Sequence, residues 1–400
     1  MSWGIYRTLH RGVLLAAWIG LSGCEQRPVS ETPKTRMSLI ETLGGSDTIG
    51  YARAVAPRIF DFPLDHGSHP NFRTEWWYVT GNLSTEDERE FGFQFTIFRN
   101  ALAPISPGGP SPWSTNQAYM GHFAVTDVDS GEFLTEENFA RGAAGLAGVT
   151  SAPLRVWVED WALEGAHREG TSPALGDEVF PLRLTAGGDG MTLNLFLEAG
   201  KPPVFQGDQG LSQKGPEPGN ASFYYSHTRM PASGLLSLGT DTLEVSGLAW
   251  LDREWSTSAL ADGYVGWDWF ALQLEDGWDM MVYSLRRSDG SAGSLSAGAL
   301  IDPDGNRIEL DWGSDLLLES THTWASPIDG AVYPAGWRIQ VLSRGWDLTI
   351  DPVIPDQELN LTFRYWEGAV RVRGTGESGG PVRGRGYVEL TGYTALLGDR

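Results

Sequence analysis

Apolar residues recur at every second position in several stretches of the chain, and this pattern most strongly limits its fold. In the clearest case, residues 91–97, Phe or Ile occupies alternate positions. Runs with the same period lie at 154–159, 192–197, 269–274 and 346–350. Successive side chains of a strand point to opposite faces, so each run predicts a β-strand. No long stretch shows the 3.6-residue period of a helix, and we expect an all-β protein.

Turn-forming clusters separate these strands. Residues 127–131, 187–190 and 302–305 combine Gly with Asp, Ser or Pro, as turns do. Many short strands joined by turns are typical of a sandwich or a barrel. Closure into a barrel is favoured, because it removes the unpaired edges of a small open sheet. A small barrel encloses either packed side chains or one small ligand.

The two halves of the chain share weak matches that occur in the same order. These matches pair 245–252 with 382–389, 223–227 with 363–367, and 77–79 with 269–271. Ordered self-similarity of this kind is the mark of a duplicated domain. We therefore predict two antiparallel barrels of about eight strands each, packed side by side, over residues 51–260 and 261–400. The segment 201–220 has the composition of a linker, but the repeat places it inside the first barrel.

The first residues have the features of a targeting segment. A weakly basic start precedes an apolar run at 12–20, which is too short to span a bilayer, and the run leads into Leu-Ser-Gly-Cys at 21–24. This tetrapeptide resembles the bacterial lipobox, in which the Cys is lipidated. We expect a signal peptide at 1–23, a lipidated Cys24 and a polar tether at 24–50. The alternative is a signal anchor with an incidental Cys.

Charge and cysteine content exclude several classes of protein. The chain has 29 basic and 51 acidic residues, a net charge of −22, which argues against a nucleic-acid partner. One Cys allows no intrachain disulfide. Glu25, rather than Asp, follows Cys24, so by analogy with lipoprotein sorting we expect an outer-membrane anchor facing the periplasm.

Three segments resemble a known family. Residues 62–81 look like the opening signature of the AttH-like group, which includes the carotenoid 1,2-hydratases (hydroxyneurosporene synthases). Residues 365–370 and 386–393 look like its closing signature, so the resemblance covers roughly 60–393. It implies two lipocalin-like barrels. Members include hydratases, secreted proteins classed as hydrolases, proteins associated with ABC exporters, and fungal cyclases.

Alkene hydration, the reaction that the hydratases in this family imply, needs an acid, a cation-stabilising surface and a base for water. Asp252 suits the acid role, because an apolar surrounding raises the pKa of a carboxyl. Trp250 lies two residues earlier, so both side chains share a strand face. His227 is the candidate base, and Tyr225 and Trp250 are candidates for lining the cation site.

The resemblance also implies a His and an Asp on these segments. This chain departs from the expected pattern, because Thr228 follows His227 where an aromatic residue is expected. The alternative is that Asp252, Arg253 and Glu254 form a structural ion-pair network. The second copy has Glu367 and Glu389 at the positions matched to His227 and Asp252, so we expect it to serve as a packing and lid domain.

Further candidates lie near the opening signature. The pair Trp76 and Trp77 places one indole on each face of a strand, one in the core and the other at the ligand pocket or the second barrel. Arg229 is the remaining candidate for ligand binding. A cluster of four residues has the donor types of a metal site but lies in an irregular loop. We expect no metal there and prefer the interpretation that these residues hold the loop rigid. The members of this cluster are Asp65, His66, His69 and Glu75.

The sequence thus predicts a periplasm-facing lipoprotein that binds an apolar lipid or isoprenoid inside a barrel. One alternative is a hydro-lyase that adds water to a terminal isoprenoid double bond. Another is an accessory protein of an ABC export system, with a transporter permease as partner. No Gly-x-Ser-x-Gly motif of a serine hydrolase is present, and no cofactor motif is found.

Overall fold

The computed structural model describes residues 48–106, 108–109, 111–166, 179–257 and 260–394. The expected signal peptide, the lipidated Cys24 and nearly all of the tether lie outside these residues. Helices in the described part are limited to the 3₁₀ turns η1 (Leu64–His66), η2 (Leu342–Arg344) and η3 (Glu377–Gly379). None of them has the length or apolar composition needed to cross a membrane.

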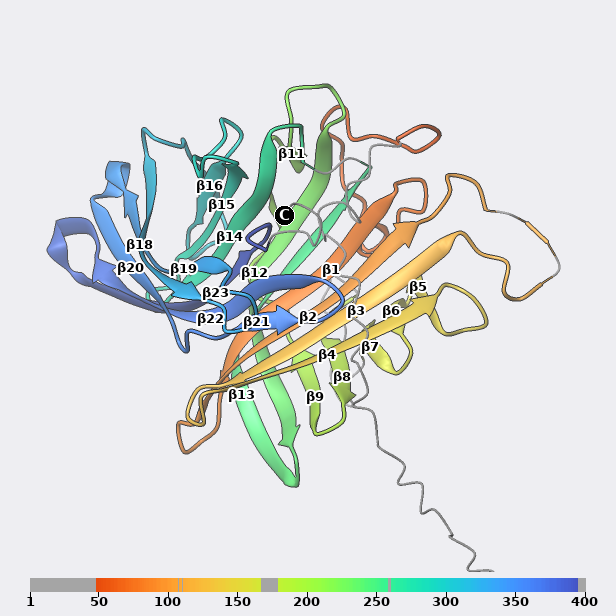
Figure 1. Cartoon of the computed structure of the whole chain (residues 1–400), viewed down its shortest axis with the longest axis horizontal. Coiled ribbons are helices and arrows are strands. Elements are labelled where there is room, and N and C mark those ends of the chain that lie inside the picture. The colour runs from red at the N-terminus through yellow and green to blue at the C-terminus, as the bar shows by residue number, and fades with distance from the viewer. Residues whose placement is uncertain (1–47, 107, 110, 167–178, 258–259, 395–400) are drawn as a thin grey trace, which may run out of the picture. The chain divides into compact units, whose positions relative to one another are not determined.

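Strands make up nearly all of the remaining regular structure, which confirms the all-β prediction. The first sheet contains β1 (Thr74–Ser84), β2 (Glu90–Ala101), β3 (Gln117–Asp127), β4 (Glu132–Arg141), β5 (Ala147–Ser151), β6 (Leu154–Val158), β7 (Trp161–Gly165), β8 (Leu182–Gly188), β9 (Met191–Leu197), β10 (Val204–Phe205), β11 (Leu211–Gln213), β12 (Ala221–Leu238) and β13 (Asp241–Ser256). The second sheet contains β14 (Tyr264–Leu274), β15 (Asp279–Arg287), β16 (Ala297–Ile301), β17 (Arg307–Leu310), β18 (Leu316–Ala325), β19 (Val332–Val341), β20 (Trp346–Pro352), β21 (Glu358–Asn360), β22 (Arg364–Thr375) and β23 (Pro381–Leu390). Figure 1 colours the first sheet from red to green and the second from teal to blue.

The two sheets have the same antiparallel topology. The first follows the order β4-β3-β2-β1-β13-β12-β9-β8-β7-β6-β5, and the second follows β17-β16-β15-β14-β23-β22-β20-β19-β18. The central triplet β1-β13-β12 is therefore equivalent to β14-β23-β22. Both sheets curl as lipocalin-like barrels do, but in the described residues their end strands are not hydrogen-bonded to each other. With 13 and 10 described strands, each exceeds the eight that we expected.

Side chains fill the inside of both sheets. In the first sheet the interior cluster includes Trp77, Phe95 and Trp161, and in the second it includes Trp337 and Trp366. A strand covered on one side only, such as β9, alternates between buried and partly exposed positions. In contrast, β1 is buried at nearly every position, because its second face packs against the other sheet.

The outer faces of the two sheets meet over their central strands. A third apolar cluster, which includes Tyr78 and Tyr224 of the first sheet and Trp269 and Tyr387 of the second, lies between them. The approach is close at Gly92 of β2, where a Cβ atom would lie 2.5 Å from that of Ala369. The two sheets thus share a buried interface, although the division into domains at 260 and 261 stays a prediction.

Candidate functional site

A pocket lies in the interface between the two sheets. Half of its sixteen lining residues are aromatic, and they include Trp76, Phe98, Trp267, Trp269, Tyr283 and Tyr365. The space open to the centre of a water-sized sphere is about 100 Å³. Since one water needs about 10–15 Å³ on this measure, the pocket has room for several waters or for a branched end group.

This position differs from the one that we expected for the ligand, the inside of a barrel. Large side chains such as Trp77 and Phe95 occupy the inside of the first sheet, and Trp337 and Trp366 occupy that of the second. The pocket is instead bounded by the outer faces of both sheets. This pocket therefore belongs to neither barrel alone.

Strand register places Asp252 at this pocket. On β13, Asp252 pairs with Tyr78 of β1 on one side and with Ser226 of β12 on the other. Directly paired residues share a face of the sheet, and residues two apart on one strand do the same. Tyr224 and Glu254, which pair with each other, therefore also face the pocket.

Asp252 is a buried carboxyl held by three donors. Tyr224 Oη donates to Oδ2 at 2.6 Å, while Ser226 Oγ and Trp250 Nε1 donate to Oδ1 at 2.5 and 2.7 Å. Burial raises the pKa of Asp252 to about 7, against the lowering effect of these hydrogen bonds, and the nearby Glu254 adds to the rise. Asp252 can therefore both lose and hold a proton near neutral pH. Trp250 contacts the acid directly, as its spacing suggested.

His227 lies on the opposite face of β12. It pairs with Leu251 rather than Asp252 and packs against the ring of Phe180 at 5.0 Å. The structure therefore does not bring the expected acid and base together, because His227 and the pocket-facing Ser226 are adjacent in a strand and point to opposite sides. Tyr225 shares the face of His227, where its hydroxyl lies 2.6 Å from His66 Nδ1.

The other candidates are also divided between the two faces. Trp76 lines the pocket, whereas Trp77 belongs to the interior of the first sheet and its indole donates to the carbonyl of His66 at 2.8 Å. Arg229 lies outside the pocket lining. Its guanidinium pairs with Asp279 of β15 at 2.6 Å, so it joins the two sheets.

Glu367 and Glu389, which we expected to belong to a packing and lid domain, line the same pocket. They pair with each other across β22 and β23, as Ser226 and Asp252 do in the first sheet. The register therefore makes Glu367 the counterpart of Ser226, one residue away from the His227 match that the sequence suggested. Burial raises the pKa of Glu389 to about 8. The charges of Asp252 and Glu254 also raise this pKa, while a hydrogen bond from Trp267 lowers it. Burial and Glu389 also raise the pKa of Glu367 well above its usual range.

Lys214 is a pocket residue that sequence reasoning missed. It follows β11, its ammonium lies 3.2 Å from Glu254, and it sits over the rings of Tyr224 and Tyr283. The ring contacts span both sheets. Its position depends on the fold of the Gly- and Pro-rich segment 201–220, for which the strand pattern gives no information.

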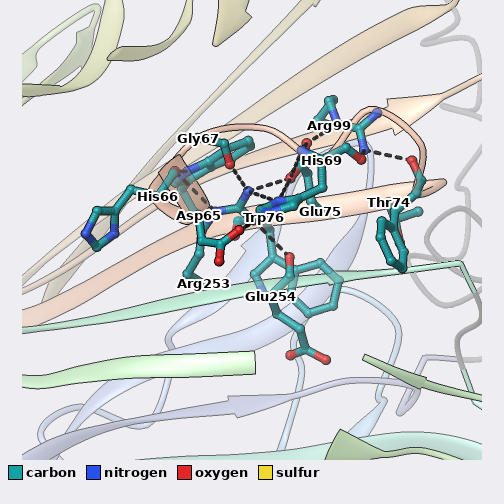
Figure 2. A network of polar contacts seen from close by, with 12 residues as sticks. Asp65, His66, Gly67, His69, Thr74, Glu75, Trp76, Arg99, Arg253 and Glu254 are labelled. Carbon is teal, nitrogen blue, oxygen red and sulfur yellow. Dashed lines mark hydrogen bonds and ion pairs between the residues drawn. The ribbon is translucent and has the colours of Figure 1, made fainter. Parts of the chain in front are cut away.

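A separate polar network braces the loop before β1 (Figure 2). Arg253 and Arg99 both pair with the buried Glu75, and Arg253 also donates to the Gly67 carbonyl at 2.5 Å. Although burial alone would raise the pKa of Glu75, the two guanidinium groups lower it well below its usual range. Figure 2 shows the Glu254 carboxylate pointing away from this network, so residues 252–254 do not form one ion-pair cluster.

The remaining metal candidates belong to the same brace. Asp65 pairs with Arg58 at 2.8 Å and with His69 at 3.0 Å, and His69 also contacts Glu75. Their carboxylates are thus engaged by cationic side chains. Within the described ranges, no group of three or more His, Cys, Asp or Glu residues is arranged to hold a metal ion.

The fold and the pocket define an all-β protein of two lipocalin-like sheets with a carboxyl-lined aromatic site between them. The chain belongs to the AttH-like family, whose model matches residues 53–393. The resemblance of residues 62–81 to the opening signature of this family is therefore confirmed. A search of curated proteins finds no match.

Solved structures share this architecture. An AttH-type protein from Nitrosomonas europaea is 34% identical, with a TM-score of 0.73 over 86% of this chain and 100% of that one. Kievitone hydratase from Nectria haematococca is 16% identical, with a TM-score of 0.62 over 90% of this chain and 98% of that one. At that identity, the second likeness concerns the fold alone.

Proposed function

We propose that the pocket between the sheets binds an apolar, unsaturated molecule of lipid or isoprenoid type, and that Asp252 catalyses addition of water to a double bond. One observation carries this proposal: a buried carboxyl with a pKa of about 7 faces an aromatic pocket. A carboxyl of this kind supplies a proton near neutral pH. The fold shared with a hydratase agrees with this reaction class.

The chemistry balances with Asp252 in both proton transfers. Its carboxylic acid gives a proton to one alkene carbon, which leaves a carbocation at the other carbon. The faces of aromatic side chains such as Trp76 and Trp269 stabilise this cation. Water adds to the cation, and its surplus proton returns to the Asp252 carboxylate. Donors from Tyr224, Ser226 and Trp250 stabilise the carboxylate between the two steps.

The pocket size restricts how such a ligand binds. A volume of about 100 Å³ accepts a branched end group. A longer isoprenoid would therefore place its terminal double bond at Asp252 and the rest of its chain outside the pocket. This mode of binding favours hydration of a terminal double bond over an internal one.

Hydration of acyclic isoprenoids tests the proposal. The wild-type protein should yield products heavier by one water, and Asp252→Asn should lose at least a hundredfold in rate, the usual effect of removing a general acid. Asp268→Asn is the matched control, because Asp268 is also buried, with a pKa that burial raises to about 6, but lies outside the pocket lining. Equal rates for wild type and Asp252→Asn would remove Asp252 as the acid.

We also propose that Cys24 anchors the protein in the cell envelope, facing the periplasm. The support is the lipobox-like run at 21–24. Cys24→Ser should shift the protein from the membrane fraction to the soluble fraction. Continued membrane association of this variant would argue for a signal anchor instead.

A further inference from the structure

Exposed apolar side chains gather on the loop between β2 and β3 and on the segment beside it. Among the described residues, the most exposed large apolar side chains include Ile49 at 83%, Ile105 at 80% and Leu102 at 65%, and Trp113 is 53% exposed. Single apolar residues are common on a protein surface, but a group of them in one place marks an interaction site. We call these four residues the apolar loop surface.

This surface joins two segments that are distant in the sequence. A Cβ atom on Gly50 would lie 2.9 Å from Cγ of Pro104, so the chain at Gly50 packs against the loop. Ile49 and Ile105 are the residues next to this contact. They therefore belong to one surface, although they are far apart along the chain.

The two arms of the loop also lie together. The Leu102 amide donates to the Asn116 carbonyl at 2.7 Å, and the Asn116 side chain donates to the Ala103 carbonyl at 2.5 Å. Leu102 on the outgoing arm and Trp113 on the returning arm therefore belong to one projection. Figure 1 shows it in orange, beyond the ends of β2 and β3.

The loop carries no charged side chain. Residues 100–126 form the longest stretch of the chain without Asp, Glu, Lys or Arg, and the loop occupies 102–116 within it. Charged side chains are costly among lipid chains, whereas Leu, Ile and Trp are favourable there or at the headgroup boundary. At the base of the loop, Arg141 donates to the Thr115 carbonyl at 2.9 Å, and a cation at that level suits lipid phosphates. This distribution fits a lipid surface better than a charged protein partner.

The segment that leads to the proposed anchor starts at the same surface. The described residues begin at Thr48, directly before Ile49, and residues 24–47 connect them to Cys24. A segment of 24 residues spans at most about 80 Å, so the anchor alone does not determine which face of the protein meets the bilayer. A second contact beside the start of this segment would determine it.

We propose that the apolar loop surface inserts into the headgroup boundary of a lipid bilayer and so holds the protein on the membrane in one orientation. The proposal rests on the Cys24 anchor proposed above and goes beyond it by naming the face that meets the lipid. Strand β2, which leads into the loop, also carries Phe98 of the pocket lining. Insertion of the loop therefore holds the pocket near the layer in which an apolar ligand dissolves.

A fluorescent label on the lipidated full-length protein tests this proposal. Lipidation blocks the one natural Cys, so Ile105→Cys supplies a single thiol for an environment-sensitive label such as NBD. In phosphatidylcholine nanodiscs the label should emit at shorter wavelength than in water, and lipids with brominated acyl chains should quench it. Leu342→Cys is the matched control, because Leu342 is 49% exposed but lies on η2 in the second sheet. Its label should stay unquenched.

A charge placed in the loop gives a second test. With the label moved to Leu102→Cys, Ile105→Asp should abolish the quenching, because the carboxylate has to stay in water. Ile105→Leu should keep the quenching. Ile105 is 80% exposed, so both variants are expected to fold.

Three outcomes would overturn the proposal, and they separate it from the proposed anchor. Water-like emission at both 105 and 342, in protein that stays on the nanodiscs, overturns the loop contact alone. A shifted emission at 105 that brominated lipids do not quench means that a second protein molecule covers the loop. Loss of the wild-type protein from the nanodiscs overturns the anchor and the loop contact together.

Discussion

Equivalent positions of the two sheets face the pocket but carry different residues. Asp252 of the first sheet accepts hydrogen bonds from Tyr224, Ser226 and Trp250. Its counterpart in the second sheet, Glu389, pairs across the strands with a second carboxyl, Glu367, and Trp267 lowers the pKa of Glu389 through a hydrogen bond. Burial raises the pKa of both acids, to about 7 for Asp252 and to about 8 for Glu389, so the second side favours the protonated form somewhat more strongly.

The difference shows how two sheets of the same topology can present unequal acids to one site. Closely similar backbone positions bring both acids to the same interface. Their cross-strand neighbours then differ, because Ser226 donates to Asp252, whereas the residue beside Glu389 is a second buried carboxyl, Glu367, whose pKa burial and Glu389 raise. The side with more hydrogen-bond donors holds its proton less tightly.

The largest expected effect compares the two acids in turnover. Asp252→Asn should lower the hydration rate by about 10²–10⁴-fold, because it removes the group that transfers the proton. Glu389→Gln should lower the rate less than tenfold, because its amide can still fill the space and donate. Steady-state rates on one isoprenoid substrate measure both. A larger loss in Glu389→Gln would reverse the assignment of the acid.

Stability should respond unequally on the two sides. Asp252→Leu leaves the donors of Tyr224, Ser226 and Trp250 without an acceptor, so unfolding should become easier by about 3 kcal/mol. Glu367→Leu removes the acceptor of the Tyr78 and Tyr365 hydroxyls but also a carboxyl whose burial is costly, so its destabilisation should be smaller. Urea titration measures both changes. Destabilisation of similar size in the two variants would mean that the hydrogen bonds to Glu367 are as strong as those to Asp252.

The pH dependence of stability should follow the raised pKa values. Asp252 and Glu389 have pKa values of about 7 and 8 when folded, against ordinary values near 4 when unfolded. The folded state therefore holds more protons, and the stability that they contribute, complete below pH 4, is lost as the pH rises through 7 and 8. The loss should reach about 1.4 kcal/mol per pH unit for each group.

Thermal unfolding from pH 5 to pH 8 checks this prediction. The free energy of unfolding should fall across that range, and Glu389→Gln should make the fall shallower, because it removes one of the two groups whose raised pKa causes the fall. Stability that rises with pH would contradict the protonated state of the second side.

The smallest expected effect is a change in the pKa of Asp252. Glu254 raises the pKa of Asp252 through its charge, so Glu254→Gln should lower that pKa by less than one unit. The activity should then decline at a correspondingly lower pH, since hydration needs the protonated acid. A pH–rate profile detects the shift. A shift to higher pH would contradict the charge effect of Glu254, because the freed Lys214 ammonium would also lower the pKa of Asp252.

Period-two patterns were enough to predict the strands, because alternation reflects which face a side chain joins. Strands β2, β6 and β9 contain all or nearly all of the runs at 91–97, 154–159 and 192–197. The adjacent residues Trp76 and Trp77 lie at the pocket and in the core, respectively. The duplication was also visible as ordered matches. Asp252 was found because it lies two residues after Trp250, on the same strand face, and because the family resemblance implies an Asp on this segment.

The rest of the site could not be predicted, because our sequence match between the two halves was wrong by one residue. Matching 223–227 with 363–367 paired His227 with Glu367, whereas the register pairs Ser226 with Glu367. A shift of one residue exchanges the two faces of a strand, so the wrong residue was expected at the pocket. The pocket position was equally hidden, because alternation does not say whether a second sheet covers the outer face of a strand.

Photocrosslinking tests the central claim, a ligand site between the two sheets, most directly. A diazirine-bearing isoprenoid ketone bound to the full-length protein and irradiated should label pocket residues of both sheets, such as Trp76 and Tyr283. Unlabelled geranylacetone in excess should abolish the labelling. Labelling confined to residues inside one sheet, such as Phe95 or Trp337, would contradict the account.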